Sequence, residues 1–590
     1  PIRGRILDRN GIPLATNKDN FRLEIVSEQT KDVAETLRML QEIIKISPES
    51  VERILTETKK RRSFVPVLVS ENLSRKEVAK IAIQTPYLPG IRIDIGQTRY
   101  YPFRDLAVHL TGYVATISQS EKTGDPVLEL PDFKIGKSGI EKSFDSKMRG
   151  RGAQRQVEVN ALGRIIRKLP GEETQMGHDI ELTIDVSLQS FSTKRLAQGN
   201  SMYIPVDDPR IQRALSEGRN LPPGTDPVNG YVNVDNKGNV QAPESGAAVV
   251  MDAFNGDVLA LASTPGFDPN SFSSGLNAAD WENLLSNPRS PMTNKAVSGQ
   301  YSPGSTFKMI VCLAALEAGV AHQETKVNCP GMIEFGDSRF HCWKKDGHGW
   351  LNMIDAIEQS CDVYLYELAK RVGIKRIGEM AARFGFGEAF NFGLPGENRG
   401  LIPTPAWKRK TFGQAWHAGE TLITSIGQGF ILCTPLQLAV MTSRLVNGGR
   451  PVLPRLVKNE RAEIQKRKSL QLSPQHLHTV LKGMDKVVNG SQGTARKVVD
   501  QSMKFQFGGK SGSVQVKRIS LDERESGKLK NKDRPWHERD HAMFVAFAPL
   551  KSPRYVVSVV VEHGGGGSTM AAPIARDILA EALRLNPSKL

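Results

Sequence analysis

The chain has 590 residues, too many for a single hydrophobic core, and this length predicts roughly two to four domains. Its composition, with 39% hydrophobic and 24% charged residues, excludes collagen-like, coiled-coil and largely disordered chains. The net charge of +16 suits nucleic acid, anionic lipid or an acidic polymer as a partner, or an ordinary basic surface. Because no zinc-finger spacing, phosphate-binding loop or RNA-binding aromatic motif accompanies the charge, no nucleic-acid partner is expected.

The N-terminal third is predicted to consist of many short elements. Residues 1–30 alternate in polarity like strands, with Asn10-Gly11 as a turn signal, and residues 31–60 have a helical apolar period. Charged stretches and short strands continue to about residue 175. We therefore expect residues 1–175 to form an elongated spacer or docking module.

The remainder, residues 176–590, is predicted to be a second domain. Residues 177–198 predict a strand and then a helix, whereas residues 199–245 are rich in Gly, Pro and Asp and predict an insertion loop. Residues 246–265 predict two strands around an Asn-Gly turn.

Long helical patterns fill about residues 305–450, and three strand candidates follow within residues 505–565. The highly charged residues 517–540 predict a solvated loop, and a C-terminal helix is expected from about Ala571. Strands from both ends of a domain with helices between them predict an α+β fold, in which helices pack against one sheet.

The segment YSPGSTFK places Ser305 and Lys308 three residues apart before an apolar run, so that both lie on one helix face. Serine needs an adjacent base to become a nucleophile, and a buried lysine can lose its proton. Taken alone, Ser-x-x-Lys occurs often by chance, and a capping serine with a surface lysine is the simpler interpretation.

Two further motifs make the set specific. Ser360 and Asp362 stand two residues apart at the start of a second helical run, and Lys510, Ser511 and Gly512 lie on a predicted strand. A cation on that strand could hold a carboxylate. Similar triplets at Lys122–Gly124 and Lys137–Gly139 precede Ser305 and are interpreted as structural.

These three motifs, in this order, resemble those of the penicillin-recognising serine enzymes. The stretches RGRILDRNGIPLA, STPGFDPNSF, SIGQGFILCTPLQLA and GGKSGSVQV extend the resemblance to the class B penicillin-binding proteins. Asp362, WKKDGHGWLN and PTPAWKRK are similar to the elongation-type members. The resemblance covers nearly the whole chain and implies an antiparallel five-stranded sheet flanked by helices. It also implies that residues 1–175 are an elongated pedestal, a dimerisation-like module.

The resemblance implies a D,D-transpeptidase that cross-links peptidoglycan stem peptides during cell-wall elongation and is a target of β-lactams. Ser305 would form the acyl-enzyme, Lys308 would be the general base, and Ser360 would pass a proton to the leaving amine. Lys510 would set the local electric field. Asp362 occupies the motif position at which Asn is commoner in the family.

In the same resemblance, the backbone N–H groups of Ser305 and Ser513 would form the oxyanion hole, and Ser511, Gly512 and Ser513 would bind the substrate. Two alternatives remain open: a hydrolytic D,D-carboxypeptidase or β-lactamase, and a non-enzymatic penicillin-binding sensor or scaffold. Rapid turnover of a penicillin adduct would indicate a β-lactamase, whereas a long-lived adduct also fits a sensor, which a cross-linking assay would separate from the enzyme. The front module of roughly 175 residues disfavours a compact β-lactamase.

The resemblance also implies location and partners. Relatives have one N-terminal anchor in the bacterial inner membrane and a catalytic domain in the periplasm. This chain contains no run of about 18 apolar residues and does not begin with Met, so we expect the anchor to be absent from it. Expected partners are a SEDS-type glycosyltransferase of the RodA kind and other elongation-complex proteins.

Three cysteines and a histidine could hold a metal. Cys329, Cys342, His348 and Cys361 form a Cys3His set that suits a structural, tetrahedral zinc ion, although the spacings of 13, 6 and 13 residues are unlike those of zinc fingers. His341 is an alternative ligand. A disulfide with one free thiol and inert buried cysteines remain open alternatives, and Cys312 and Cys433 are expected in the core.

Overall fold

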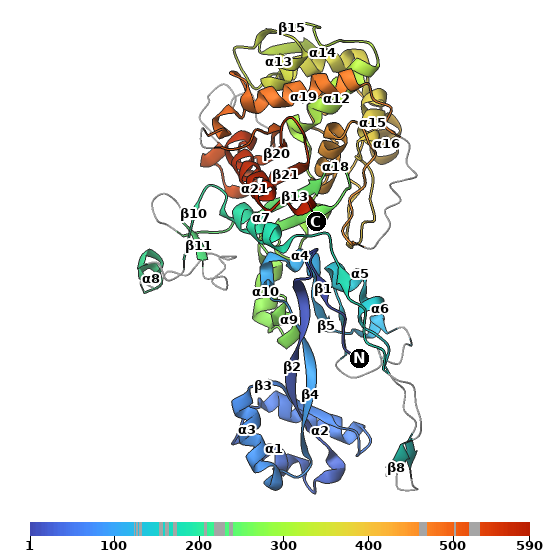
Figure 1. Cartoon of the computed structure of the whole chain (residues 1–590), viewed down its shortest axis with the longest axis vertical. Coiled ribbons are helices and arrows are strands. Elements are labelled where there is room, and N and C mark those ends of the chain that lie inside the picture. The colour runs from blue at the N-terminus through green and yellow to red at the C-terminus, as the bar shows by residue number, and fades with distance from the viewer. Residues whose placement is uncertain are drawn as a thin grey trace.

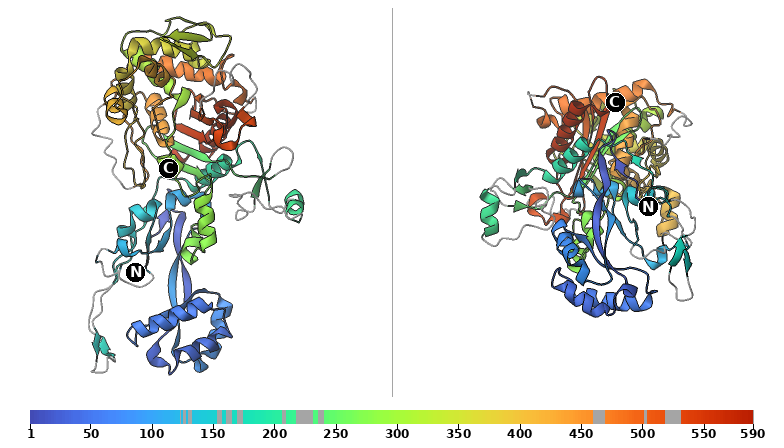
Figure 2. Two further views of the ribbon diagram at one scale, coloured as in Figure 1. Left: turned by 180° about the vertical axis from the view of Figure 1, so that it is seen from behind. Right: turned by 60° about the horizontal axis from the view of Figure 1, so that its bottom comes forward.

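A computed structural model of the whole chain describes residues 1–122, 124, 128, 133–152, 157–159, 165–168, 174–205, 209–216, 231–234, 240–458, 469–500, 503–517 and 531–589. The molecule is elongated, with a large C-terminal domain at one end and an N-terminal module that extends away from it (Figure 1). The view from behind shows the same arrangement (Figure 2). Within the described part of the chain, no helix combines the length and apolarity that a membrane span requires.

The C-terminal domain is built on one antiparallel five-stranded sheet, which confirms the predicted fold class. Its strand order is β14–β13–β21–β20–β19, so strands from both ends of the domain lie side by side. All residues of β13, β14 and β21 are buried, because helices cover both faces of the sheet. The strands are β13 (Gly246–Asp252), β14 (Val258–Thr264), β19 (Gly508–Val514), β20 (His541–Ala548) and β21 (Tyr555–Val561).

Helices α7 and α21 pack against each other and against one face of this sheet, and α18 packs against the other face (Figures 1 and 2). Helices α13, α14, α15 and α19 form a second layer around α12, whereas α9 and α10 lie beside the N-terminal module (Figure 1). The helices of the domain are α7 (Val186–Gln198), α9 (Asn270–Ser274), α10 (Ala278–Ser286), α11 (Lys295–Ser298), α12 (Lys308–Glu317), α13 (Met353–Glu358), α14 (Asp362–Val372), α15 (Ile374–Arg383), α16 (Pro405–Phe412), α17 (Ala418–Ser425), α18 (Pro435–Val446), α19 (Pro474–Asn489) and α21 (Ala572–Leu585).

Helix α12 lies at the centre of this layer. Every residue from Lys308 to Leu316 is buried, so the helix is enclosed on all sides. Two short hairpins lie beside α14, and they consist of β15 (Val327–Cys329) with β18 (Gly349–Leu351) and β16 (Met332–Phe335) with β17 (Ser338–His341).

The N-terminal module has two parts with separate cores. A far lobe packs helices against strands around its own apolar cluster, whereas the near part adds side chains such as Leu14, Ile140 and Met148 to the core of the C-terminal domain. The far lobe contains α1 (Val33–Gln41), α2 (Pro48–Lys60), α3 (Arg75–Gln84) and β3 (Val67–Leu73), together with parts of β2 (Pro13–Ile25) and β4 (Ile91–Tyr100). The near part contains β1 (Ile6–Leu7), α4 (Val108–Thr111), β5 (Val114–Thr116), β6 (Lys134–Gly136), α5 (Gly139–Ser143), α6 (Asp145–Met148) and β9 (Ile180–Glu181). Strands β7 (Val157–Val159) and β8 (Ile165–Lys168) form a separate two-stranded sheet that lies away from the near part, at the height of the far lobe (Figure 1).

Strand β9 lies just after the predicted boundary at residue 175 and pairs in parallel with β1 of the pedestal. The boundary itself stays a prediction. Residues 199–245, for which a loop is predicted, contain a three-stranded sheet and one helix as well as segments outside the described residues. These elements are β10 (Met202–Pro205), β11 (Tyr231–Val234), β12 (Val240–Gln241) and α8 (Pro209–Ser216). The sequence did not predict these strands, because they are short and lie among Gly, Pro and Asp residues.

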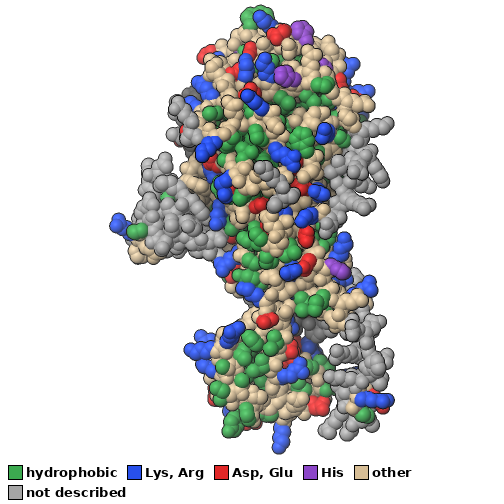
Figure 3. Space-filling view, viewed as in Figure 1, with side chains coloured by type: hydrophobic (Ala, Val, Ile, Leu, Met, Phe, Trp, Pro, Cys, Tyr) green, Lys and Arg blue, Asp and Glu red, His purple; other side chains and the backbone are tan. Residues whose placement is uncertain are grey.

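Of the charged residues 517–540, those at 518–530 lie outside the described residues, and two 3-10 turns at Asn531–Asp533 and Trp536–Glu538 precede β20. On the face shown in Figure 3, lysine and arginine side chains are spread over both domains and gather in no single patch. This distribution fits a generally basic surface on that face better than a nucleic-acid groove.

A buried ionic network holds the near part together. Glu141 is 0% exposed and accepts hydrogen bonds from Arg3 Nε and Arg99 Nε at 2.6 Å each. Tyr101 donates to the same carboxylate at 3.3 Å, and Arg3 also pairs with Asp145 at 2.8 Å. Burial alone would raise the pKa of Glu141, but the two arginines outweigh it and lower the pKa below its usual value.

His109 of α4 lies at the junction between the module and the C-terminal domain. Its Nε2 donates to the carbonyl of Pro265 at 3.3 Å. The side-chain amide of Asn294 donates to the backbone carbonyl of His109 at 3.0 Å. Burial, and secondarily the positive charge of Lys295, lower the pKa of His109 to about 3. The imidazole is therefore neutral at physiological pH.

Acidification is expected to destabilise this junction. The pKa of His109 is lower in the folded state than its unfolded value of 6.5, so the unfolded chain takes up the proton first as the pH falls. Protonation of His109 in the unfolded chain then lowers the free energy of unfolding by about 2 kcal/mol between pH 7 and pH 5. Thermal melts of His109→Gln should depend less on pH than those of the unchanged protein, whereas exposed His537→Gln should follow the unchanged protein. Equal pH dependence in all three proteins contradicts this assignment.

Candidate active site

The first motif lies in a one-turn 3-10 helix, Gly304–Phe307, and not within the α-helix that the sequence predicts. Gly304 adopts φ +56° and donates its N–H to the carbonyl of Gly427 at 2.8 Å. A Cβ on Gly304 would stand 3.0 Å from Val514 Cγ2, so the turn is pressed between that carbonyl and β19. Residues three apart eclipse in a 3-10 turn, which places Ser305 above Lys308.

The catalytic residues predicted from the second and third motifs meet at the start of α12. Lys308 Nζ donates to Ser360 Oγ at 3.2 Å and to the Ser360 carbonyl at 2.8 Å, and it pairs with Asp362 Oδ1 at 2.7 Å. Lys510 Nζ donates to the same Ser360 Oγ at 2.8 Å. The Ser360 hydroxyl thus lies between two amines that come from α12 and β19. Among the described residues, the Ser305 hydroxyl has no hydrogen-bond partner.

The two amines differ in their surroundings. Both Lys308 and Lys510 are 0% exposed, but only Lys308 lies against a carboxylate. Burial, and secondarily the neighbouring Lys308, lower the pKa of Lys510 well below its ordinary value. The site therefore contains one amine that is compensated by Asp362 and a second that favours its neutral form.

Ser360 joins α13 to α14 in a strained conformation. Its φ of 54° lies in the left-handed region, which a residue with a side chain seldom adopts. Its carbonyl accepts from Lys308 Nζ and from the indole N–H of Trp343 at 3.1 Å, which hold the peptide in this orientation.

The predicted substrate-binding residues lie on β19 beside the first motif. Ser511 Oγ lies 3.1 Å from Thr494 Oγ1, and Ser513 Oγ accepts the N–H of Gly567 at 3.1 Å. A Cβ on Gly512 would stand 3.3 Å from the Pro303 carbonyl, so glycine allows β19 to approach the turn that carries Ser305. Sequence reasoning missed Thr494, Gly567, Gly427 and Trp343, which are distant in the chain and belong to none of the three motifs.

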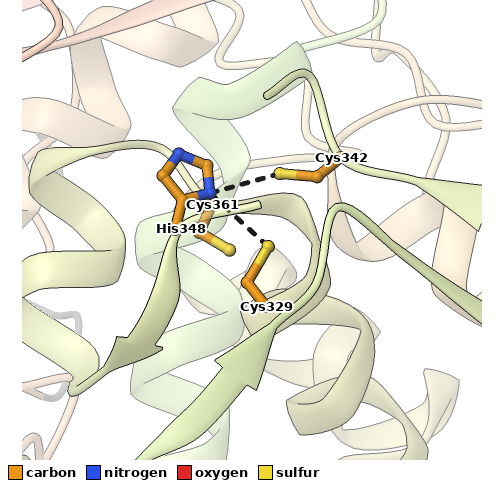
Figure 4. Close-up of side chains that lie close together, drawn as sticks. All are labelled: Cys329, Cys342, His348 and Cys361. Atoms are coloured by element: carbon orange, nitrogen blue, oxygen red, sulfur yellow. Dashed lines mark hydrogen bonds between the residues drawn. The ribbon is translucent and has the colours of Figure 1, made fainter. Parts of the chain in front are cut away.

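The predicted metal ligands converge behind the second motif. Cys329, Cys342, His348 and Cys361 have ligand atoms that all lie within 4.8 Å of one another, and they point toward a common centre (Figure 4). The Sγ atoms of Cys329 and Cys342 each lie 3.5 Å from His348 Nδ1. All five cysteines are free thiols in the structure.

Two of the three thiols in the cluster favour the thiolate form, whereas hydrogen bonds to Cys329 and Cys342 raise the pKa of Cys361. Hydrogen bonding from Cys361 and then from His348 lowers the pKa of Cys342 to about 2, and the same groups lower that of Cys329 to about 6. The backbone N–H of Asp362 points at Cys342 Sγ at 3.4 Å. Cys312 and Cys433, by contrast, are fully buried in the apolar core, and burial raises the pKa of both thiols.

His341, the predicted alternative ligand, lies outside the group of four whose donor atoms converge. Lys137 of the early Lys-Ser-Gly triplet forms an ion pair with Glu121 in the pedestal. For the other early triplet, the residue between Lys122 and Gly124 lies outside the described residues.

Comparison with known proteins identifies the two halves of the chain. Residues 246–580 match the family model of the penicillin-binding protein transpeptidase domain, and residues 1–182 match that of the penicillin-binding protein dimerisation domain. The chain belongs to the family of penicillin-binding protein transpeptidases.

Its relatives include the peptidoglycan D,D-transpeptidase MrdA of Escherichia coli K12, which is 31% identical over 98% of this chain and 86% of the relative. MrdA of Acinetobacter baumannii is 33% identical over 97% of this chain and 80% of the relative. Penicillin-binding protein 2 of Helicobacter pylori, solved in complex with MreC, superposes with a TM-score of 0.81 at 28% identity and covers 99% of this chain and 98% of that one.

These relatives are of the elongation type that the sequence motifs predict. The predicted family, the α+β transpeptidase fold and the enzyme class, a serine-type D-Ala-D-Ala transpeptidase, are confirmed. No comparison tests the predicted role of any single residue, and those roles follow as proposals.

Proposed function

We propose that this chain cross-links peptidoglycan stem peptides in cell-wall elongation through an acyl-enzyme on Ser305. The observation that carries the proposal is the convergence of Lys308 and Lys510 on one hydroxyl, Ser360 Oγ, beside the turn that presents Ser305. A hydroxyl between two amines is a route along which a proton can move, and acyl transfer needs such a route.

In the first step, Ser305 Oγ attacks the carbonyl carbon of the penultimate D-Ala and its proton passes to Lys308, the general base. Lys308 can accept this proton once its own proton has moved through Ser360 Oγ to Lys510, whose lowered pKa favours a neutral amine at the outset. The peptide bond then breaks, and Ser360 passes a proton to the departing amine of the terminal D-Ala.

In the second step, the amine of a neighbouring stem peptide attacks the acyl-enzyme and regenerates the Ser305 hydroxyl. A β-lactam acylates the same oxygen, but its opened ring stays attached to the acyl group. The backbone N–H groups of Ser305 and Ser513 stabilise the oxyanion, and Ser511, Gly512 and Ser513 bind the substrate and its terminal carboxylate. The position of Gly512 against Pro303 supports this placement.

The activity is tested with a stem peptide that ends in D-Ala-D-Ala, with and without an added amine acceptor. Transpeptidation predicts that D-Ala release is matched by a cross-linked product when acceptor is present. Release matched by hydrolysed peptide alone identifies a carboxypeptidase, and rapid loss of a penicillin adduct identifies a β-lactamase. A stable adduct without any D-Ala release, with the polymerase partner present, identifies a sensor.

We also propose that the cysteine–histidine cluster holds a structural zinc ion. Three thiols and an imidazole match the tetrahedral donor set of zinc, and the two Sγ–Nδ1 distances of 3.5 Å match the separation of tetrahedral ligands about 2.0–2.3 Å from one ion. His348 Nε2 is buried without a partner among the described residues, while its Nδ1 faces the thiols. When bound, zinc would act as a cross-link between the two hairpins and the loop of Ser360, because four protein ligands leave no open position.

Removal of the metal is expected to lower the melting temperature by about 5 °C or more, because thiolates left close together repel one another. The measurement compares melts before and after a chelator, alongside elemental analysis for zinc. Cys329→Ser should melt like the chelated protein and respond little to chelator. An unchanged melt together with no detectable metal contradicts the zinc proposal.

For partners, we propose that the pedestal docks onto other proteins of the elongation complex. The H. pylori relative forms a complex with MreC, which supports an MreC-like partner here. A SEDS-type glycosyltransferase of the RodA kind remains the expected polymerase. The proposed location is the periplasmic side of the bacterial inner membrane.

A further inference from the structure

Trp343 lies between the cysteine–histidine cluster and the second catalytic motif. It follows Cys342 directly in the chain, and its indole meets the ring of His348 edge-on, with 5.4 Å between ring centroids. The residue is nevertheless 57% exposed, so hydrophobic burial does not explain its position.

Both N–H groups of Trp343 are directed to residues 359–362, which contain the second motif. Its indole Nε1 donates to the carbonyls of Gln359 and Ser360, at 3.1 Å each. Its backbone N–H donates to Asp362 Oδ2 at 2.9 Å, while the other oxygen of that carboxylate pairs with Lys308.

Together, these contacts form a closed ring of hydrogen bonds that joins Trp343, Ser360, Lys308 and Asp362. The Ser360 carbonyl accepts from Trp343 Nε1 on one side and from Lys308 Nζ, at 2.8 Å, on the other. Ser360 holds a φ of 54°, which requires support from its surroundings. Loss of the indole donor would leave the carbonyl with Lys308 alone and release the peptide that carries the Ser360 hydroxyl.

We propose that Trp343 is a positioning residue that ties the geometry of the cysteine–histidine cluster to Ser360 and Lys308. The inference rests on the proposed roles of those two residues. Trp343 touches no reacting atom in this arrangement. It acts through the peptide of Ser360 and the carboxylate of Asp362, and its own position depends on Cys342 and His348.

The first test is Trp343→Phe, which keeps an aromatic ring beside His348 and removes only the N–H donor. The rate constant for acylation by a fluorescent penicillin should fall about three- to ten-fold, the range expected for one hydrogen bond. The pH profile of acylation should also shift, because the proton route through Ser360 is disturbed. Melting temperature and zinc content should not change, because the side chain is largely exposed.

Trp350→Phe is the matched control. Trp350 belongs to β18 beside the same cluster, is 71% exposed, and its indole makes no hydrogen bond among the described residues. The Trp350→Phe variant should be acylated at the same rate and with the same pH profile as the unchanged protein. Equal rates and pH profiles for Trp343→Phe and the unchanged protein overturn the proposal, as does an equal loss in both variants. Absence of any adduct in the unchanged protein would instead refute the proposed function of Ser305.

The second test concerns the link to the cluster. Chelation should slow acylation of the unchanged protein more than that of Trp343→Phe, because the variant has already lost the connection. The total tryptophan emission of Trp350→Phe should change on chelation. The change should vanish in the double variant Trp343→Phe/Trp350→Phe, so that the difference between the two variants reports Trp343 above the four tryptophans that both retain. Additive effects of chelation and Trp343→Phe, or an emission change that persists in the double variant, contradict transmission through this side chain.

Discussion

Replacing Ser305 by alanine is expected to abolish the covalent adduct with penicillin and to lower cross-linking by about ten-thousand-fold or more. The substitution removes the only atom that bonds to the acyl group in the proposed mechanism, while Lys308, Ser360 and Lys510 keep their mutual hydrogen bonds. Intact-mass spectrometry after incubation with penicillin gives a direct readout, because the unchanged protein gains the mass of the whole β-lactam.

Ser302→Ala is the matched control for this experiment. Ser302 lies three residues upstream, before the same turn, and has no part in the proposed mechanism. It should acquire the adduct at close to the unchanged rate. An adduct that persists in Ser305→Ala, located by peptide mapping at another serine, would place the nucleophile elsewhere and refute the mechanism.

Glu141→Ala is expected to destabilise the near part of the pedestal by about 3–5 kcal/mol, the effect of removing one partner from a buried ionic network. The change leaves the Arg99 guanidinium, 3% exposed, and that of Arg3 without the carboxylate that they share at 2.6 Å. Arg99 Nη2 already has no partner among the described residues, so little else is present to compensate the charge. Denaturant unfolding and hydrogen exchange across residues 1–20 and 99–148 measure the loss.

An exposed ion pair provides the comparison for Glu141. Glu334 and Arg339 pair at 3.2 Å with side chains that are 65% and 64% exposed, so Glu334→Ala should cost about 1 kcal/mol or less. The Glu141 variant that remains folded should still be acylated by penicillin, because Glu141 contacts no residue of the proposed site. Equal, small losses for both variants would show that the buried network contributes no more than a surface pair.

The motifs made much of the site predictable from the sequence. Ser305 and Lys308 are fixed relative to each other by local helical geometry, and the order of strands at the two ends of the domain predicts the central sheet. The four ligand residues of the cluster could be selected by their chemistry alone, although their spacing gave little support. In each case the signal is either local or carried by rare residue types.

The rest of the site depends on contacts between loops that are distant in the chain. Thr494 meets Ser511 and Trp343 meets Ser360 only through the packing of α19, β19 and the β16–β17 hairpin. The ion pair between Lys308 and Asp362 spans 54 residues. The sequence alone could not show whether Asp362 would pair with Lys308 or with Lys510. The 3-10 geometry at Ser305 likewise follows from the close approach of Gly427 and Val514 to Gly304 and has no local sequence signal.

The strands β2 and β4 pair without interruption from Thr16 with Tyr100 to Ile25 with Ile91. Ten residues of paired strand span about 30 Å. At the near end, Asn270 grips the backbone of Tyr101 with two hydrogen bonds, and at the far end the same strands form part of the core of the distal lobe. The two paired strands therefore fix the distance between the far lobe and the C-terminal domain. A partner that binds the far lobe is held at this fixed distance from the domain that contains Ser305.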